Sequence, residues 1–440
     1  MKKISRTGMI AGLLFFVTLS AQEYPGFRVI GRYLYDPCGE KVILRGVANP
    51  NIWFQKDGLP QYEEIEKTGA NVIRIVWSTS GTADELRMAV ENCIDYEMIP
   101  MVELHDATGN WSLLDEMVDY WISQDILYVI EDYEEYLLVN IANECGDYFV
   151  SNETFRTDYE AHINTMRDAG IHVPLVIDGT DWGKNIDILQ SEGPSLIEAD
   201  PDHNLLFSVH MWWPAKYGYS ESDIVNEIAE SVNMELPLIV GEFGHMHDDE
   251  NVTEVTAANS IPYLTILEQC QLNEVGYIAW SWFGNSNPLY DMSSDGTYEG
   301  LNGWGLEVAV TDENSIANTS VRPYFIENGN CNASLEDSNN PAVERDFALI
   351  SGFPNPFNAT VTIQYSVNEP GMVRLDILNT RGQIVQTLSR GWKTAGQYMT
   401  RWDSRDHSGT EMPSGTYFCR MTTKQGGERR QQMIKLLLLK

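Results

Sequence analysis

Two glutamates stand at the ends of two strongly apolar segments of the sequence. Glu144 ends the stretch LLVNIANE (137–144), and Glu242 lies near the end of LPLIVGEFG (236–244). Segments of this length and composition predict strands that are buried on both faces. A carboxylate beside such a strand is costly unless it is paired or used. Because the two acids are placed alike in one chain, we expect them to work as a pair.

Two carboxyl groups that face each other across a cleft can hydrolyse a glycosidic bond. One protonates the leaving oxygen while the other attacks the anomeric carbon. Each acid alone could instead be a structural member of an ion pair. Since the two acids occur together with aromatic residues at other strand ends, the catalytic interpretation is favoured.

Eight short apolar segments alternate with amphipathic, charge-bearing ones and would position the two acids. They span residues 42–46, 71–77, 99–106, 137–144, 173–179, 205–212, 236–243 and 276–284. Between two of them, TFRTDYEAHINTMRDAG (154–170) predicts a helix that Gly170 should end. Eight alternating strand and helix units predict an α/β fold of the TIM (β/α)8 barrel type. A doubly wound open sheet is the alternative, but no glycine-rich phosphate loop follows the first strand.

The chemistry of a TIM barrel lies where its strands end and lead into helices. Glu144 and Glu242 would close strands four and seven, so they should converge at one mouth of the barrel. The residues at the predicted strand ends are polar or aromatic: Arg74, His105, Asn143, Glu144, Asp178, His210, Glu242 and Trp280.

Several of these segments resemble glycoside hydrolase family 5 over about residues 28–325: NVIRIVW, VELHDATGN, VNIANE, SVHMW, IVGEFG and AWSWFGNS. HDATG, GEFG and AWSWFGNS look most like the bacterial β-mannanases of its subfamily 8. The resemblance implies a retaining, endo-acting hydrolase of β-1,4-linked mannan or glucomannan that needs no cofactor. It implies that Glu144 is the general acid/base and Glu242 the nucleophile.

The resemblance also implies roles for the residues around the two acids. Asn143 would hold the sugar 2-hydroxyl, and Arg74 and His210 would support the nucleophile's side of the cleft. Trp280 would form the floor of the cleavage subsite.

Further aromatic residues are candidates for substrate binding, because the apolar C–H faces of sugars stack on indole rings. They are Trp53, Trp182 and Trp212, together with His105. Each of them could instead belong to the core, since tryptophan is a common large apolar residue. His245 and His247 give only a weak metal signal without a third ligand in view, and we predict no catalytic metal.

Two positions depart from the family pattern and leave the sugar preference open. Asn49 and Asn51 stand where the mannanases have histidines, and Trp212 stands where the family usually has tyrosine. An indole N–H can donate one hydrogen bond but can accept none. An endo-β-1,4-glucanase therefore stays as the alternative activity, with a non-catalytic glycan-binding protein as a further one.

The charge of the chain is distributed unevenly. The 440 residues carry a formal net charge of −35, with 16 basic and 56 acidic residues up to 340, and 13 basic and 8 acidic residues from 341 onward. The acidic body argues against nucleic acid or an anionic membrane as a partner. The change of sign predicts two domains with different surfaces.

The start of the chain has the layout of a secretory signal peptide. Lys2, Lys3 and Arg6 precede the apolar run MIAGLLFFVTL, which ends at Ser20 and Ala21. We therefore predict a signal peptide at 1–21, with a buried N-terminal helix as the alternative. Export would permit disulfides.

The cysteines allow at most two bridges outside the C-terminal part. Cys145 is predicted to be unpaired, and bridges among Cys38, Cys93, Cys270 and Cys331 are left open.

The C-terminal part alternates like short strands with turns between them and predicts a small all-β, immunoglobulin-like sandwich. We place the catalytic domain at 22–328, a polar linker at 329–347 and the sandwich at 348–440. PNPFN, DILNTRGQIV, SGTYF and the ending KLLLLK resemble the sorting domain of the type IX secretion system. That resemblance implies a protein secreted or displayed on the outer membrane, with the type IX machinery as a partner. We expect the chain to be a monomer. A carbohydrate-binding module is the alternative.

Overall fold

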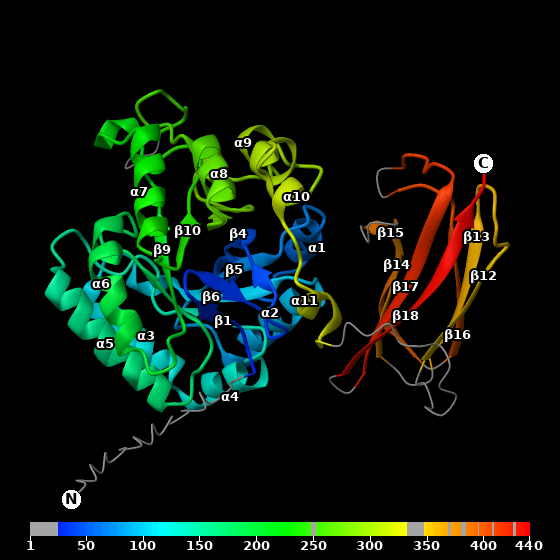
Figure 1. Ribbon diagram of the computed structural model, residues 1–440, viewed down its shortest axis with the longest axis horizontal. Coiled ribbons are helices and arrows are strands. Elements are labelled where there is room, and N and C mark those ends of the chain that lie inside the picture. Colours follow the sequence, from blue (N-terminus) through cyan, green and yellow to red (C-terminus); the bar gives the residue numbers. More distant parts are fainter. Residues whose placement is uncertain are drawn as a thin grey trace, which may run out of the picture.

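Eight parallel strands close into a barrel in the computed structural model (Figure 1). The hydrogen-bonded order is β10–β11–β4–β5–β6–β7–β8–β9. Barrel strands that follow one another in the sequence are therefore paired, and the barrel closes where the last strand, β11, pairs with the first, β4. This confirms the predicted TIM barrel. The barrel strands are β4 (Arg45–Asn49), β5 (Val72–Trp77), β6 (Ile99–Leu104), β7 (Leu138–Asn140), β8 (Leu175–Asp178), β9 (Leu205–His210), β10 (Leu238–Glu242) and β11 (Gly276–Ala279).

The structure describes residues 25–247, 252–331, 347–367, 371–379, 384–394, 396–406, 409–425 and 428–440. The predicted signal peptide lies outside these ranges, as does most of the predicted linker. Within them, no helix is both long and apolar enough to cross a membrane.

Helices cover the outside of the barrel and begin and end where local signals place them. Thr82 caps α2 through a capping box with Glu85, and the predicted stop at Gly170 is confirmed, since Gly170 has a positive φ of 93° just after α5. The helices are α1 (Gln61–Glu66), α2 (Ala83–Asp95), α3 (Leu114–Trp121), α4 (Gln124–Asp132), α5 (Asn152–Asp168), α6 (Ile186–Ala199), α7 (Glu221–Asn233), α8 (Tyr263–Leu272), α9 (Gly303–Leu306), α10 (Ile316–Thr319) and α11 (Tyr324–Asn328).

The first barrel strand begins later than predicted. It is β4, from Arg45, whereas Lys41–Val42 form β3 of a small antiparallel sheet with β1 (Arg28–Ile30) and β2 (Tyr33–Tyr35). Leu34 and Val42 pair across that sheet and pack against apolar residues at the starts of the barrel strands. The sheet therefore closes the barrel at the end opposite to the strand ends.

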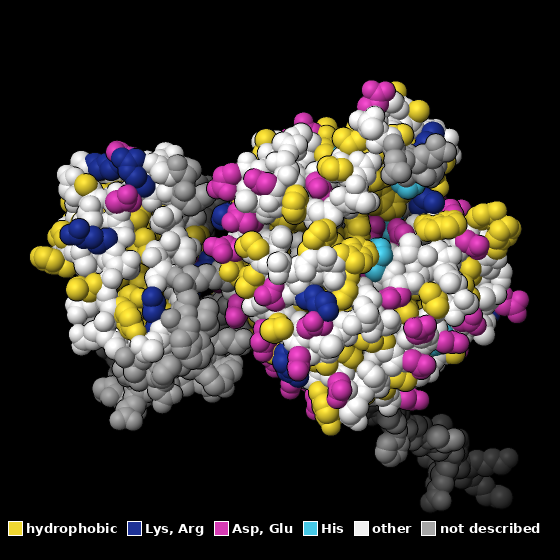
Figure 2. Space-filling model, turned by 180° about the vertical axis from the view of Figure 1, so that it is seen from behind, with side chains coloured by type: hydrophobic (Ala, Val, Ile, Leu, Met, Phe, Trp, Pro, Cys, Tyr) yellow, Lys and Arg dark blue, Asp and Glu magenta, His cyan; other side chains and the backbone are white. Residues whose placement is uncertain are grey.

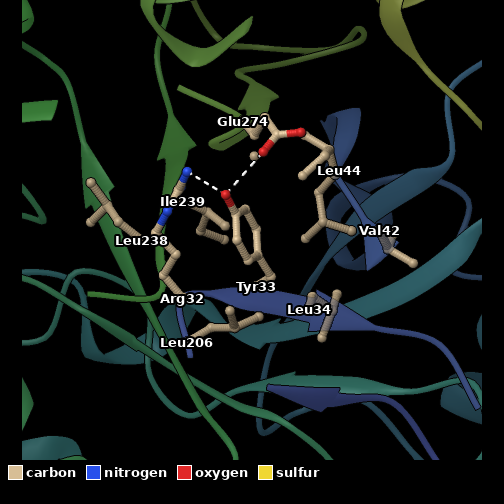
Figure 3. Close-up of a pocket in the computed structure, with 11 residues that line it drawn as sticks. Arg32, Tyr33, Leu34, Val42, Leu44, Leu206, Leu238, Ile239 and Glu274 are labelled. Atoms are coloured by element: carbon tan, nitrogen blue, oxygen red, sulfur yellow. Dashed lines mark hydrogen bonds between the residues drawn. The ribbon is translucent and has the colours of Figure 1, made fainter. Parts of the chain in front are cut away.

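A very small pocket lies between this sheet and the barrel (Figure 3). Tyr33 donates a hydrogen bond to Glu274 at 2.9 Å and accepts one from Arg32 at 2.5 Å. The lining is otherwise mainly aliphatic, and the space amounts to about 20 Å³, so it is too small to hold a sugar. It belongs to the packing of the closed end.

One disulfide joins the two ends of the barrel domain. Cys38 bonds to Cys331 across 293 positions of sequence. Four cysteines among the described residues are unbridged and buried: Cys93, Cys145, Cys270 and Cys419. The prediction that Cys145 is unpaired is confirmed, and no bridge forms between Cys93 and Cys270.

The C-terminal part forms a sandwich of two antiparallel sheets, which confirms the predicted all-β, immunoglobulin-like fold (Figure 1). Its own apolar core includes Val361, Leu375, Trp402 and Met421. One sheet contains β12 (Phe347–Phe353), β13 (Val361–Val367) and β16 (Gly396–Trp402). The other contains β15 (Ile384–Lys393), β14 (Gly371–Leu378), β17 (Gly415–Gln425) and β18 (Glu428–Leu438).

Candidate active site

Glu144 and Glu242 meet at the mouth of the barrel, as predicted. Glu242 is the last residue of β10, but Glu144 does not close its strand, since β7 ends four positions earlier at Asn140. Glu144 has a positive φ of 46°, and its main-chain N–H donates to Asp178 Oδ2 at 2.9 Å. Both acids are buried, with 8% and 3% of their surface exposed. The turn of the chain after β7 therefore directs the Glu144 side chain into the cleft.

Arg74, on β5, ties the two sides of the site together. Its Nη1 donates to Glu242 Oε1 at 2.7 Å, while its Nη2 donates to Asn140 at 2.8 Å and Asn143 at 2.6 Å. Burial acts to lower the pKa of Arg74, but the carboxylates around it, Glu103 foremost, more than offset burial and the pKa is raised. Arg74 is thus a permanent cation beside Glu242, which agrees with its predicted support of the nucleophile.

Sequence reasoning missed two buried polar residues of this network. Glu103 Oε1 lies 2.9 Å from His105 Nδ1 and 3.6 Å from Arg74 Nη1, and Asn140 donates to Asp178 at 3.0 Å. Both lie inside apolar strands, β6 and β7, and both are completely buried. The sequence contains a signal that could have identified them, namely a polar residue within an apolar strand segment. Such a residue is buried and needs a hydrogen-bond partner inside the barrel.

His210, the last residue of β9, lies nearer to Glu144 than to Glu242. Its Nδ1 is 2.8 Å from Glu144 Oε1 and 3.6 Å from Glu242 Oε2. His210 therefore lies beside both acids, and its support of the nucleophile's side stays a prediction. Burial acts to lower its pKa, but the carboxylates of Glu242, Asp178 and Glu144 raise it to about 9, so that the imidazole is protonated at neutral pH.

The two acids form an electrostatically coupled pair. Burial, together with the charge of Glu144, raises the pKa of Glu242 to about 7, against the lowering effect of His210 and Arg74. Burial acts in the same direction on Glu144, but His210 outweighs it, and the pKa of Glu144 is lowered. With His210 protonated, the first proton that the pair takes up therefore favours Glu242.

The hydrogen-bond donors around the pair favour the opposite distribution of that proton. Arg74 and Trp212 can only donate, and both point at oxygens of Glu242, so each stabilises the ionised form of Glu242. Glu144 faces His210, whose Nδ1 is an acceptor in the neutral tautomer that carries its proton on Nε2. Loss of the His210 proton would therefore shift the shared proton toward Glu144.

Trp212 takes the place in which the family pattern has tyrosine, and it contacts the candidate nucleophile. Its indole N–H donates to Glu242 Oε2 at 3.3 Å, and only 7% of the residue is exposed. The ring packs edge-on against Tyr290 at 5.8 Å and lies 5.6 Å from the His247 ring. Trp212 is therefore a donor to Glu242 as well as a wall of the cleft.

We expect Trp212→Phe to lower kcat/KM about tenfold, because one hydrogen bond to a charged group is lost. Losing a donor to the ionised form should also raise the pKa of Glu242, so activity should begin to fall at a higher pH as the solution is acidified. The pH–rate profile measures both effects. Trp213→Phe is the matched control, since the Trp213 indole donates to the main-chain oxygen of Lys184. Equal profiles for both variants would contradict this role.

Aromatic side chains line the mouth on both sides of the acids. His105 stacks on Trp280 with ring centroids 5.5 Å apart and meets Trp53 edge-on at 5.0 Å. Trp53 is 55% exposed and Trp182 39%, which leaves ring faces free to meet a sugar. Figure 2 shows a hollow in the barrel lobe in which histidine side chains appear among hydrophobic ones. The structure brings the predicted aromatic residues together at one cleft.

A cavity of about 310 Å³ opens beside Glu144. It is lined by Glu144, Trp182, Lys184, Trp212 and His247. Sequence reasoning did not select Lys184 as a site residue, because it lies in a loop with no pattern of its own.

The positions that depart from the family pattern have partners inside the protein. Asn49 donates to Asn51 at 2.8 Å, and Asn51 donates to the Tyr62 hydroxyl at 2.9 Å.

His245 stacks on Trp304 at 5.1 Å, and burial lowers its pKa to about 4. Among the described residues, the single three-residue group with metal-ligand spacing is Glu144, His210 and Glu242. These are the two candidate catalytic acids and the histidine beside them.

Comparison with known proteins places this cleft in a family. The family model "Cellulase (glycosyl hydrolase family 5)" matches residues 35–286. The chain belongs to glycosyl hydrolase family 5. Residues 357–427 match the FlgD Ig-like domain. As a member of this family with paired acids at the strand ends, the chain is an endo-acting glycoside hydrolase.

Similar proteins of this family include several mannanases. The chain is 34% identical to a mannan endo-1,4-beta-mannosidase of Salipaludibacillus agaradhaerens, over 64% of this chain and 90% of the relative. It is 32% identical to that of Cellvibrio japonicus, over 71% and 72%. The mannotriose complex of a Thermomonospora fusca beta-mannanase superposes with a TM-score of 0.60 at 30% identity, covering 69% of this chain and all of the other.

Proposed function

We propose that this family 5 enzyme cleaves internal β-1,4-mannosidic bonds of mannan and glucomannan with retention of anomeric configuration. One observation carries the retaining mechanism: an oxygen of Glu144 lies within 4.8 Å of an oxygen of Glu242. Carboxyl groups about 5–5.5 Å apart are typical of retaining enzymes, whereas inverting enzymes need about 6.5–9.5 Å for an intervening water. The mannanases among the relatives support the choice of substrate.

The reaction follows from the positions of the two acids. In the proton distribution that neutral His210 favours, ionised Glu242 attacks the anomeric carbon while the bond to the leaving oxygen breaks, and that oxygen takes its proton from Glu144. Glu144 then removes a proton from water, which attacks the same carbon and releases Glu242. Arg74 and Trp212 stabilise the charge on Glu242 before attack and after release.

The substrate would lie along the aromatic residues of the cleft. Trp280 and Trp53 would stack under sugars on one side of the cleavage point, and Trp182 would serve the cavity beside Glu144 on the other. Asn143 would meet the 2-hydroxyl, since it is held between Arg74 and Thr108, to which its amide donates at 2.9 Å. This contact bears on the C2 position, where mannose and glucose differ.

The substrate assignment is tested on unsubstituted mannan and carboxymethylcellulose in parallel assays. We expect reducing ends to be released from mannan and at most slowly from carboxymethylcellulose. Glucomannan cannot separate the two activities, because it contains both kinds of bond. The Glu242→Ala variant, assayed at the same protein concentration, controls for contaminating hydrolases. Faster cleavage of carboxymethylcellulose would make the enzyme a β-1,4-glucanase.

We also propose that the enzyme is exported, that it acts outside the inner membrane, and that residues 348–440 form the type IX sorting domain. The Ig-like fold of this domain and its resemblance to sorting domains support the proposal. Fusing these residues to a periplasmic carrier protein should bring the carrier to the cell surface or medium of a host with type IX secretion. The carrier alone should stay in the periplasm, as should a fusion in a type IX mutant. Binding of the fusion to insoluble mannan without export would identify a carbohydrate-binding module instead.

A further inference from the structure

Charged side chains are buried on the outward face of one sheet of the C-terminal sandwich. Along β14, Val373, Leu375 and Ile377 fill the sandwich core, so the alternate residues Arg374 and Asp376 face away from it. Yet Arg374 is only 7% exposed and Asp376 is fully buried. The outward face of a sandwich is solvated unless another part of the molecule covers it.

A neighbouring strand continues this buried charged face. On β17, Arg420 pairs directly with Asp376 and Thr422 with Arg374, and both β17 residues are also buried. Arg420 donates to Asp376 at 3.3 Å, and Arg374 Nε donates to it at 3.0 Å. Among the described residues of β14 and β17 on this face, two guanidinium groups surround one carboxylate, so a further carboxylate beside them would be stabilising.

The barrel supplies the missing carboxylates. Arg374 Nη2 donates to Glu66 Oε1 at 3.0 Å, and its Nη1 lies 3.5 Å from Glu97 Oε1. Arg420 Nη1 lies 4.0 Å from Glu327 Oε2. Figure 2 shows acidic side chains of the barrel lobe beside basic ones where the two lobes meet.

The three carboxylates lie around Arg322 on the surface of the barrel domain. We name this surface the acidic face, and it consists of Glu66, Glu97, Arg322 and Glu327. Arg322 lies 3.4 Å from both Glu66 and Glu97, and only 1% of Glu97 is exposed. Arg374 adds a second guanidinium beside Glu66 and Glu97, and Arg420 brings one to Glu327. A buried carboxylate is costly unless it is paired, so the sandwich arginines complete this surface.

The acidic face lies away from the catalytic mouth. Glu66 ends α1 and Glu97 follows α2, so both precede a barrel strand. Glu144 follows a strand, and Glu242 is the last residue of one. In a TIM barrel these two kinds of connection lie at opposite ends. A domain bound there leaves the cleft open to a polysaccharide.

We propose that the acidic face is a docking site for the C-terminal domain of the same chain, and that Arg374 and Arg420 hold the two domains together as one body. Docking covers the sheet that contains β14 and β17 and leaves the sheet of β12, β13 and β16 on the far side. Any partner of the C-terminal domain would then meet that far sheet or the strand ends.

Small-angle X-ray scattering of the full chain tests the proposal. The wild type should scatter as one body, with the barrel and the sandwich in contact. The double variant Arg374→Met, Arg420→Met should show a larger radius of gyration and a pair-distance distribution with two separated maxima. Arg401→Met is the matched control, because Arg401 is an exposed arginine on β16, and its scattering should equal that of the wild type.

The double variant could unfold the sandwich, so a second substitution is made in the barrel domain. Glu97→Gln removes one carboxylate of the acidic face without touching the sandwich, and it should also increase the radius of gyration. Wild-type hydrolysis of soluble mannan, measured for each variant, would show that the barrel is folded. Scattering by separated domains in the wild type, or wild-type scattering by Glu97→Gln and a folded double variant, would overturn the proposal.

Discussion

Glu242→Ala is expected to abolish turnover of both polysaccharide and activated aryl mannosides. Without the carboxylate no glycosyl-enzyme can form, and loss of a covalent nucleophile costs on the order of 10⁴- to 10⁶-fold in kcat. The effect should not depend on the leaving group, because every substrate has to pass through the same intermediate. Rates on mannan and on a dinitrophenyl mannoside, measured side by side, check this expectation.

Azide separates loss of the nucleophile from general damage to the site. A small anion can enter the space left by the Glu242 side chain and attack the anomeric carbon from the same face. The glycosyl azide should then have inverted configuration, which NMR reads directly. Product of retained configuration would assign the nucleophile to another residue. For the unmodified enzyme, the first-formed sugar should keep its configuration.

Glu144→Ala should instead discriminate between substrates. Cleavage of mannan should fall about 10²- to 10⁴-fold, because the leaving oxygen of a sugar has to be protonated. A dinitrophenolate leaves without protonation, so formation of the glycosyl-enzyme from the aryl mannoside should be largely spared. A burst of phenolate followed by slow turnover is the expected time course, and azide should speed the slow phase and give product of retained configuration.

The same variant carries a pH prediction whose sign follows from the coupling of the two acids. The negative charge of Glu144 raises the pKa of Glu242, so its removal should lower that pKa. Activity on the aryl substrate should then persist to a lower pH than in the wild type. An acid limb that moves to higher pH would show that the charge of Glu144 does not act on the nucleophile.

The two variants together also test the assignment of the roles. If Glu144→Ala abolished activity on both substrates while Glu242→Ala kept activity on the aryl mannoside, the roles of the two acids would be exchanged.

The sequence by itself determined the architecture and the two acids. Hydrophobic periodicity is local, so eight apolar segments between amphipathic ones suffice to indicate the barrel, and a parallel barrel brings its strand ends together whatever the details. Glu242 and Arg74 lie on strands. The directions of their side chains therefore follow from the alternation of successive strand residues between the two faces of the sheet. The predicted bounds of β4 were wrong, because Val42 is as apolar as a barrel residue but pairs with Leu34 in a separate sheet.

Tertiary structure decided the contacts between segments that lie far apart in the chain. The partner of His210 is set by the turn after β7 that carries Glu144, and no local pattern encodes the 2.8 Å between them. The pairing of Cys38 with Cys331 depends on closure of the whole barrel. Arg374 looks like an ordinary outward residue of a strand, and only the barrel surface that covers it turns this arginine into a buried charge. Burial and distance are properties of the folded chain, and they determine which charges are paired and which carboxyl holds the proton.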